Sequence, residues 1–324
     1  MEISSFLPDS TPADHWKLRT RTLIAGRLPL LMGIINVTPD SFSDGGCFLD
    51  PDAAVEHALQ LVADGADILD VGGESTRPFS ESVDVQEELR RVMPVVGALC
   101  KQTKTPISID TSKALVAKYA LHAGVEMIND VTGLTGDPAM LPLAVESGCG
   151  VCVMHMRGTP KTMQDAPEYA DVVAEVFDYL KCRRDALIAA GIEQDRIALD
   201  PGIGFSKTTE HNLQLLANAR RFHALGCPVL IGHSRKRFLA GLIEGAEKDR
   251  VGTARHREIS DGDQPADGLP DGGRCASCVP LDRNVGTIGV ALSLARQGVQ
   301  VLRVHDVAAV RQALVAFAAA GGLA

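Results

Sequence analysis

Short apolar runs alternate with longer helical patterns along most of this chain, and that alternation restricts the possible folds more than any other feature. The order is the one expected of successive βα units, in which a helix crosses over between two parallel strands. Eight runs with helices between them predict an α/β protein, a single-domain TIM (β/α)8 barrel, which 324 residues can build. The runs cover residues 30–35, 68–71, 106–109, 126–128, 151–154, 197–199, 229–231 and 299–304.

The intervals between the runs carry helical patterns with start signals of their own. Asp50, followed by Pro51, is predicted to cap the helix after the first run, and Ser112 is predicted to cap the helix that begins at Lys113. The predicted helices cover residues 53–64, 85–99, 113–123, 138–146, 171–190, 212–225, 287–297 and 307–320.

The chain before the first run divides into a loose leader, residues 1–13, and an alternating segment, residues 16–24. In that segment Trp16, Leu18 and Ile24 share one face with two threonines, as in a half-buried strand. A turn at residues 25–27 would let the segment pair with the residues that follow, as a hairpin closing the barrel floor. We therefore predict a leader and floor hairpin in residues 1–27, and the barrel in residues 28–324.

Residues 254–283 interrupt the alternation before the last strand. They are rich in Asp, Gly and Pro and have no apolar periodicity, so they are predicted to form a solvated, disordered-looking insertion. Residues 249–253 and 282–287 nearly repeat each other around it, and either copy could open the helix at 287–297. The insertion would lie near the active-site rim or at a subunit contact.

The charge balance is acidic, with 32 Lys and Arg against 41 Asp and Glu and a formal net charge of −9. This balance argues against nucleic acid and anionic membranes as partners, and local cations must capture any anionic ligand. No apolar stretch reaches the ~18 residues of a membrane-spanning helix, and the first residues lack the basic start of a signal peptide. We expect a cytoplasmic protein.

Eight cysteines are scattered through this long chain, which does not indicate a disulfide framework. Cys149 with Cys152 and Cys275 with Cys278 fit a Cys-x-x-Cys pattern. Neither pair has a second pair or a His partner at the spacing of a zinc site. Reduced thiols are predicted, with a structural zinc as the alternative.

Polar groups end every predicted strand. In a TIM barrel the carboxyl ends of the strands form one face, and that face carries the active site. Turn formers and helix caps could explain one or two such residues, but not the whole series. The strand-end groups are Asn36, Gly72 with Arg77 just after it, Asp110, Asn129 with Asp130, His155, Asp200, Ser234 with Lys236, and Arg303 with His305.

Two kinds of recognition follow from these side chains. Asp110 and Asp200 can each accept two hydrogen bonds and Asn129 can donate and accept, which suits a flat heterocycle rich in N–H groups. Asp200 could instead be a turn former before Pro201. Arginine offers a forked donor that matches a phosphoryl edge, so Arg303 favours an anion site.

Several short motifs follow one another along the chain. Residues 36–46, Asn-Val-Thr-Pro-Asp-Ser-Phe-Ser-Asp-Gly-Gly, resemble the first signature of the dihydropteroate synthase family, and residues 72–78, Gly-Gly-Glu-Ser-Thr-Arg-Pro, resemble the second. Members join p-aminobenzoate to a pterin pyrophosphate. Further matches keep the family's order at residues 110–112, 129–130, 154–156, 200–202, 234–236 and 303–306.

The resemblance implies roles for particular residues, a Mg²⁺ ion and a homodimer. Catalysis would involve Asp110, Lys236, Asn36 and Arg77, with Asp110 near a pterin cation that forms by SN1-like loss of pyrophosphate. The implied pterin site comprises Asp110, Asn129, Asp200, Lys236, Met154 and Gly232; the pyrophosphate site Asn36, Arg77, Arg303 and His305; the p-aminobenzoate site Thr76, Pro78, Phe205, Ser234 and Lys236; and the metal ligands Asn36 and Asp44.

Two other hypotheses compete with membership of the dihydropteroate synthase family. A pterin-binding barrel that transfers a methyl group from a folate to a corrinoid would share the carboxylates, but would not use the pyrophosphate cluster. A non-catalytic pterin-binding or scaffolding protein is suggested by the insertion alone. His233, Arg237 and Ile203 depart from the family's usual residues, and they could alter the p-aminobenzoate side.

Overall fold

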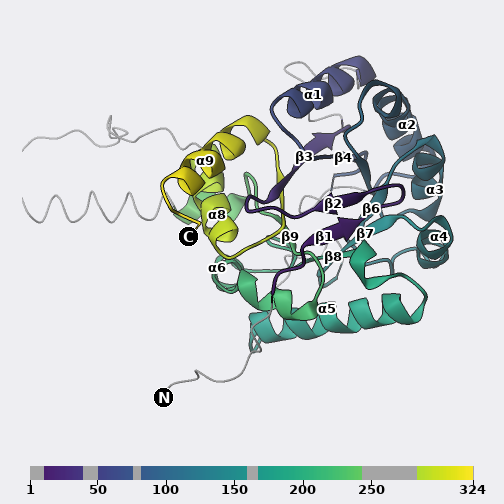
Figure 1. Ribbon diagram of the computed structural model, residues 1–324. Coiled ribbons are helices and arrows are strands. Elements are labelled where there is room, and N and C mark those ends of the chain that lie inside the picture. Colours follow the sequence, from purple (N-terminus) through teal and green to yellow (C-terminus); the bar gives the residue numbers. More distant parts are fainter. Residues whose placement is uncertain (1–10, 39–49, 76–81, 159–166, 243–282, 324) are drawn as a thin grey trace, which may run out of the picture.

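Eight parallel strands form one sheet in the order β8-β7-β6-β5-β4-β3-β10-β9. The structure is a computed structural model that describes residues 11–38, 50–75, 82–158, 167–242 and 283–323. A parallel bridge between Leu199 and Val229 joins the two edge strands, so the ring closes and the predicted TIM barrel is confirmed (Figure 1). The strands are β3 (Leu30–Asn36), β4 (Ile68–Gly72), β5 (Ile107–Asp110), β6 (Met127–Asp130), β7 (Gly150–Met154), β8 (Ile197–Asp200), β9 (Leu230–Gly232) and β10 (Val301–Val304).

Helices surround the barrel (Figure 1). Asp50 caps α1, with Oδ1 accepting from Asp52 N at 3.0 Å, as predicted. The predicted Ser112 cap is wrong, because α3 begins one residue later and Asp137 of a neighbouring loop accepts from Ala114 N at 2.9 Å. The helices are α1 (Pro51–Ala63), α2 (Val85–Gln102), α3 (Ala114–Ala123), α4 (Met140–Ser147), α5 (Val172–Ala189), α6 (Thr209–Ala217), α8 (Arg283–Arg296) and α9 (Val307–Ala319), with 3₁₀ turns η1 (Gln194–Arg196) and η2 (Ala219–Leu225).

The barrel interior is apolar at one end and polar at the other. Strand register sets this division, since inward side chains alternate along each strand: Ile68 lies deep, Asp70 lies one step higher, and Gly72 lies at the mouth. The deep level is a fully buried cluster that excludes water from the barrel centre. It consists of Trp16, Leu18, Met32, Ile68, Met127, Cys152, Ala198, Leu230 and Val301.

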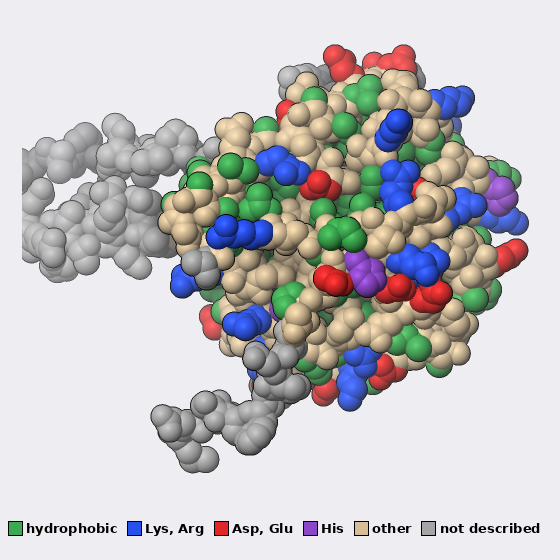
Figure 2. Space-filling model, in the orientation of Figure 1, with side chains coloured by type: hydrophobic (Ala, Val, Ile, Leu, Met, Phe, Trp, Pro, Cys, Tyr) green, Lys and Arg blue, Asp and Glu red, His purple; other side chains and the backbone are tan. Residues whose placement is uncertain are grey.

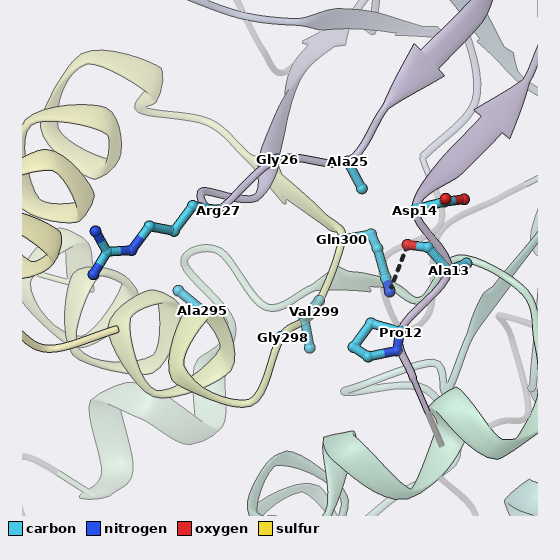
Figure 3. Close-up of a pocket in the computed structure, with 10 residues that line it drawn as sticks. All are labelled: Pro12, Ala13, Asp14, Ala25, Gly26, Arg27, Ala295, Gly298, Val299 and Gln300. Carbon is cyan, nitrogen blue, oxygen red and sulfur yellow. Dashed lines mark hydrogen bonds between the residues drawn. The ribbon is translucent and has the colours of Figure 1, made fainter. Parts of the chain in front are cut away.

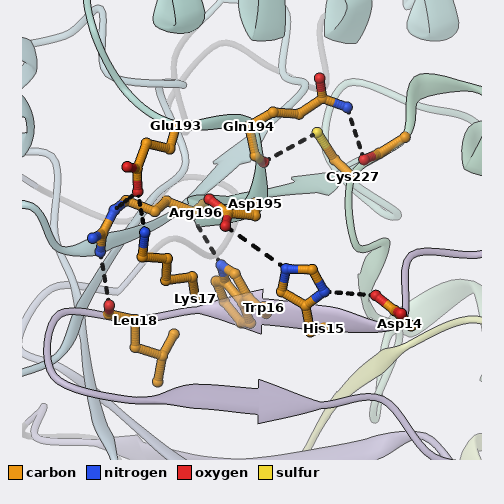
Figure 4. Close-up of polar contacts among 11 residues, drawn as sticks. Asp14, His15, Trp16, Lys17, Leu18, Glu193, Gln194, Asp195, Arg196 and Cys227 are labelled. Atoms are coloured by element: carbon orange, nitrogen blue, oxygen red, sulfur yellow. Dashed lines mark hydrogen bonds and ion pairs between the residues drawn. The ribbon is translucent and has the colours of Figure 1, made fainter.

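An N-terminal hairpin, β1 (His15–Lys17) and β2 (Thr22–Ile24), closes the deep end. Trp16 Nε1 donates to Arg196 O at 3.0 Å, and Arg196 donates to Leu18 O at 2.7 Å (Figure 4). The predicted turn at residues 25–27 is wrong, because Trp16 pairs with Leu23 and the chain reverses within the predicted strand. Buried Glu126 explains this reversal, since its carboxylate accepts from Thr20 N and Oγ1 and from Arg21 Nε.

The outer surface over the hairpin carries acidic and basic side chains interspersed (Figure 2). Among the described helices, none is long and apolar enough to span a membrane. Cys149 and Cys152 are free and buried, whereas Cys275 and Cys278 lie outside the described residues. The predicted insertion also lies outside them, apart from Arg283, which is the first residue of α8 and was wrongly assigned to the insertion.

Candidate active site

The barrel mouth gathers most of the predicted strand-end residues that the structure describes, whereas the Asp130 carboxylate accepts from Thr132 N and Leu134 N of its own loop. Strand register places Gly72 opposite Asn36 and Asp110, and places Asp110 opposite Asn129. On the other side of the ring Met154 pairs with Asp200, and Gly232 pairs with Arg303. Because these pairs occur at the carboxyl ends of consecutive strands, their side chains face one shared space.

Arg303 is held between two carboxylates. Its Nε donates to Asp70 Oδ2 at 2.6 Å and its Nη2 donates to Asp110 Oδ2 at 2.7 Å. Asn129 Nδ2 donates to the same Asp70 oxygen at 3.1 Å. Asp70 is fully buried, and its second oxygen, Oδ1, has no hydrogen-bond partner within the described part of the chain. One buried carboxylate therefore orients two predicted site residues.

Asp70 was not among the site residues predicted from the sequence. Its signal is a charged residue inside the apolar run Ile68-Leu69-Asp70-Val71, at an inward position between Ile68 and Gly72. Charged side chains are rarely fully buried unless they are paired, so an aspartate there already predicts a cationic partner inside the barrel.

The charges of this cluster depend on burial. Burial raises the pKa of Asp110 to about 7, although the Arg303 guanidinium acts in the opposite direction, and Asp70 raises it further. For Arg303 burial disfavours the charge, but Asp70 and Asp110 raise the pKa above the ordinary arginine value. Arg303 therefore stays protonated, while Asp110 can gain or lose a proton near neutral pH.

A second group, from the end of β8 and from the segment after β9, surrounds the loop after β8. Asp200 Oδ1 accepts from Gly202 N at 2.7 Å, and burial raises the pKa of Asp200 while the Gly202 N–H and Lys236 lower it. Lys236 donates to Ile203 O, and its Nζ lies 4.1 Å from the centre of the Phe205 ring. Burial lowers the pKa of Lys236 to about 7 against the attraction of Asp200.

A third group joins β9 to β10. His305 Nδ1 lies 3.0 Å from Ser234 Oγ, which also accepts from His305 N at 3.2 Å. His233, one of the departures, points away into the core, where its Nε2 lies 3.1 Å from Thr287 O on α8. Burial lowers the pKa of His233 to about 4, so it is a neutral contact between strand and helix.

The other two departures are Ile203 and Arg237. The Ile203 side chain is buried in the core, and Arg237 is exposed. Four predicted site residues lie outside the described residues: Asp44, Thr76, Arg77 and Pro78.

The loop after β4 begins at an ion-pair cluster. Lys113, just beyond Asp110, donates to Glu74 and, at 2.6 Å, to Glu88 Oε2 on α2. Glu88 is fully buried, and a Cβ on Gly73 would lie 2.6 Å from Val92 Cγ1, so only glycine fits between this loop and α2. The cluster anchors the described part of the loop that leads toward Arg77.

A cavity of about 190 Å³ lies at the opposite end of the barrel (Figure 3). Its lining includes Arg27 and Gln300, which precede β3 and β10, and Gln300 Nε2 donates to Ala13 O at 3.2 Å across one side of it. None of the predicted site residues lines this cavity. The active site of a TIM barrel lies at the carboxyl ends of the strands, so this is not the candidate site.

A closed parallel barrel with buried carboxylates and cations at its mouth defines a TIM-barrel enzyme, and residues 32–305 match the model of a family described as "Pterin binding enzyme". A dihydropteroate synthase of Escherichia coli strain K12 is 42% identical over 279 residues, which are 86% of this chain and 87% of that one. The chain therefore belongs to the dihydropteroate synthase family, transferases of folate biosynthesis, and the resemblance seen in the sequence is confirmed.

Solved structures agree with this assignment. A Xanthomonas albilineans dihydropteroate synthase with 4-aminobenzoic acid is 41% identical with a TM-score of 0.79, covering 95% of this chain and 98% of that chain. A structure from the same organism in complex with 7,8-dihydropteroate is 40% identical with a TM-score of 0.75 and the same coverage.

Proposed function

We propose that this chain condenses 6-hydroxymethyl-7,8-dihydropterin pyrophosphate with p-aminobenzoate, giving 7,8-dihydropteroate and pyrophosphate. The observation that carries the proposal is the mouth itself, where Asp70 and Asp110 hold Arg303 beside Asn129. This arrangement combines acceptors for a heterocycle with cations for an anionic leaving group, at one end of a closed barrel.

The pterin would lie across the polar level of the barrel. Asp200 and Asp110 each present a carboxylate to its amino and ring N–H groups, and Asn129 supplies an amide. Lys236 would donate to the pterin carbonyl oxygen and a ring nitrogen. Met154, 3% exposed, lies opposite Asp200 in the register, and we propose that it contacts the flat face of the ring, with Gly232 leaving room for it.

Pyrophosphate would bind at the outer edge of the mouth. His305 and Arg303 are on or just after β10, where barrels often place phosphate groups, and Asn36 lies at the end of the neighbouring strand β3. Two of the donors of Arg303 are engaged by carboxylates, and a guanidinium has five N–H groups, so it can also reach an anion. We propose the same role for Arg77.

Asn36 would be a ligand of Mg²⁺, with Asp44. Within the described ranges no group of three His, Cys, Asp or Glu side chains could hold a metal ion. One neutral amide oxygen fits an ion that keeps several waters and is bound mainly through substrate phosphates. When bound, Mg²⁺ supplies positive charge that stabilises the leaving pyrophosphate.

The reaction we propose is SN1-like. The bond between the pterin methylene carbon and the pyrophosphate oxygen breaks first, and the electron pair leaves with pyrophosphate. The Asp110 carboxylate stabilises the resulting pterin cation, which the amine of p-aminobenzoate then attacks, and the nitrogen loses a proton. Five residues would hold the p-aminobenzoate in position for this attack: Thr76, Pro78, Phe205, Ser234 and Lys236.

The decisive experiment supplies purified protein with Mg²⁺, the pterin pyrophosphate and p-aminobenzoate, and follows 7,8-dihydropteroate and pyrophosphate together. Equal amounts of both are expected. Consumption of either substrate without equal product formation would contradict the proposed reaction. We further propose a homodimer, as the resemblance implies, located in the cytoplasm, and light scattering of the purified protein tests the dimer.

A further inference from the structure

Lys207 is a buried lysine that the reaction described above does not use. Only 3% of it is exposed. Its Nζ lies 3.0 Å from His155 Nδ1, 2.9 Å from Phe205 O and 3.4 Å from His155 O. An ammonium has three N–H donors, and these three acceptors match them.

Keeping a cation here costs folding free energy. No carboxylate in the described part of the chain lies within ion-pair distance of Lys207. Burial lowers the pKa of Lys207 well below its ordinary value, despite the attraction of Asp200. A buried charge without a close counter-ion is destabilising, so a purely structural role would be met better by an apolar side chain.

The acceptors of Lys207 belong to two different loops of the mouth. His155 follows β7, and Phe205 lies on the loop after β8. The loops are in close contact, since a Cβ on Gly202 would lie 2.0 Å from His155 O. Arg157 N donates to Ser206 Oγ at 3.0 Å, and Ser206 Oγ donates to Arg157 O at 2.5 Å. The Lys207 amino group is thus part of a cross-link between the β7 and β8 loops.

The loop after β8 also contacts Lys236, a residue predicted to bind substrate. A Cβ on Gly204 would lie 2.6 Å from Lys236 Cδ, and the Lys236 ammonium contacts both Ile203 O and the Phe205 ring. Because Lys207 binds the backbone of Phe205 and Lys236 binds its ring, a shift of the Phe205 backbone would displace both groups.

We propose that Lys207 is a positioning residue for the p-aminobenzoate site. It fixes the Phe205 backbone against His155, and thereby sets the wall on which the aromatic amine lies. The proposal rests on the proposed function, which assigns Phe205 and Lys236 to that site.

The test is Lys207→Met, which keeps much of the side-chain volume and removes the ammonium. We expect the KM for p-aminobenzoate to rise about tenfold, the effect of losing one charged hydrogen bond. We expect binding of the bare hydroxymethyl pterin, measured by calorimetry, to weaken less than that of p-aminobenzoate, because Asp200, Asp110 and Asn129 lie on strands and only Lys236 contacts this loop. Relief from burying a charge should offset the unpaired acceptors, so the Tm should stay within about 4 °C of the wild type.

The control is Lys181→Met, which removes an exposed lysine on α5 and should leave both binding constants unchanged. An unchanged KM for p-aminobenzoate in Lys207→Met would overturn the proposal, and so would equal weakening of both ligands. The assay of the wild-type protein distinguishes failure of this inference from failure of the proposed function. If the wild type makes dihydropteroate and Lys207→Met matches it, only this inference fails, whereas an inactive wild type refutes the proposed function itself.

A second pair of variants decides the matter if Lys207→Met does not fold. His155→Gln keeps an acceptor for Lys207, and His155→Phe keeps an aromatic ring beside Tyr179, whose ring centre lies 4.8 Å from that of His155. We expect a raised KM for p-aminobenzoate in His155→Phe and a near-normal value in His155→Gln. Identical values in both variants would show that the Lys207 contact has no part in positioning.

Discussion

Arg303 on β10 donates to the Asp70 carboxylate on β4 at 2.6 Å, although 233 positions separate the two residues in the sequence. Strand β3 lies between β10 and β4, so the guanidinium reaches across one strand inside the barrel. The same Asp70 oxygen accepts from Asn129, and the same guanidinium donates to Asp110. The polar level of the barrel is therefore one connected network, and its members should respond together to substitution.

Asp70→Asn tests that network. The amide keeps the shape but removes the charge that holds Arg303, so we expect kcat/KM for the pterin pyrophosphate to fall about tenfold to a hundredfold. Asp67→Asn is the matched control, because Asp67 Oδ2 also accepts from an arginine, Arg311 at 2.8 Å, but at the other end of β4. Steady-state kinetics should show a loss in the first variant and little change in the second, and similar losses in both would argue against a specific role for Asp70.

Asp110→Asn should keep the fold and much of the pterin binding but lose most turnover. The shape of the site survives, while the charge proposed to stabilise the cation is lost. Removing one such preorganised group commonly lowers kcat by ~10² to 10³. Rapid-quench measurement of a single turnover, with calorimetry of pterin binding, checks both parts. Turnover like that of the wild type would transfer the role to another carboxylate, with Asp200 the next candidate.

The pH dependence of kcat/KM should be bell-shaped with a narrow optimum near neutral pH. Asp110, with its pKa raised to about 7, gains a proton and loses its negative charge as the pH falls below that value. Lys236, with its pKa lowered to about 7, loses its positive charge as the pH rises above that value. Since kcat/KM reports on the free enzyme, both limbs should be visible there.

Two variants assign these limbs. Asp110→Asn should flatten the acid limb, and Lys236→Arg should flatten the alkaline limb, because arginine keeps its charge. The substrates are the same in every profile, so their own titration cancels in the comparison. An alkaline limb that persists in Lys236→Arg would show that another group titrates there.

Deletion of residues 254–282 should leave activity and Tm close to those of the parent. Each doubling of a surface loop costs only about 0.6 kcal/mol of closure entropy, so the segment can be shortened without a large change in stability. The deletion should stop before α8, because Arg283 O accepts from Thr287 Oγ1 at 2.8 Å and Asn284 Oδ1 accepts from Arg235 Nε at 2.9 Å. Thermal melting and the coupled product assay measure the outcome, and an insoluble or inactive variant would mean that the segment packs at the mouth or at a subunit contact.

The sequence predicted the barrel and the composition of its mouth, because both follow from local patterns. The alternation of apolar runs and helices gave the βα order, and polar residues at strand ends marked one face. The hairpin turn was misplaced for a tertiary reason, since Glu126, more than a hundred positions away, accepts from the chain at Thr20 and Arg21. The Ser112 cap failed similarly, because the loop residue Asp137 provides the acceptor.

What the sequence alone determined is which residues end the strands and which family signatures they form. Only the tertiary structure decided which of them touch. Asp70 pairs with Arg303 because β4 and β10 both lie beside β3, and Lys207 pairs with His155 because β7 and β8 are neighbours in the sheet. The register decides which partners a buried charge can reach, and the low dielectric of the interior decides how strongly it interacts with them. Neither can be deduced from the residues next to the charge in the sequence.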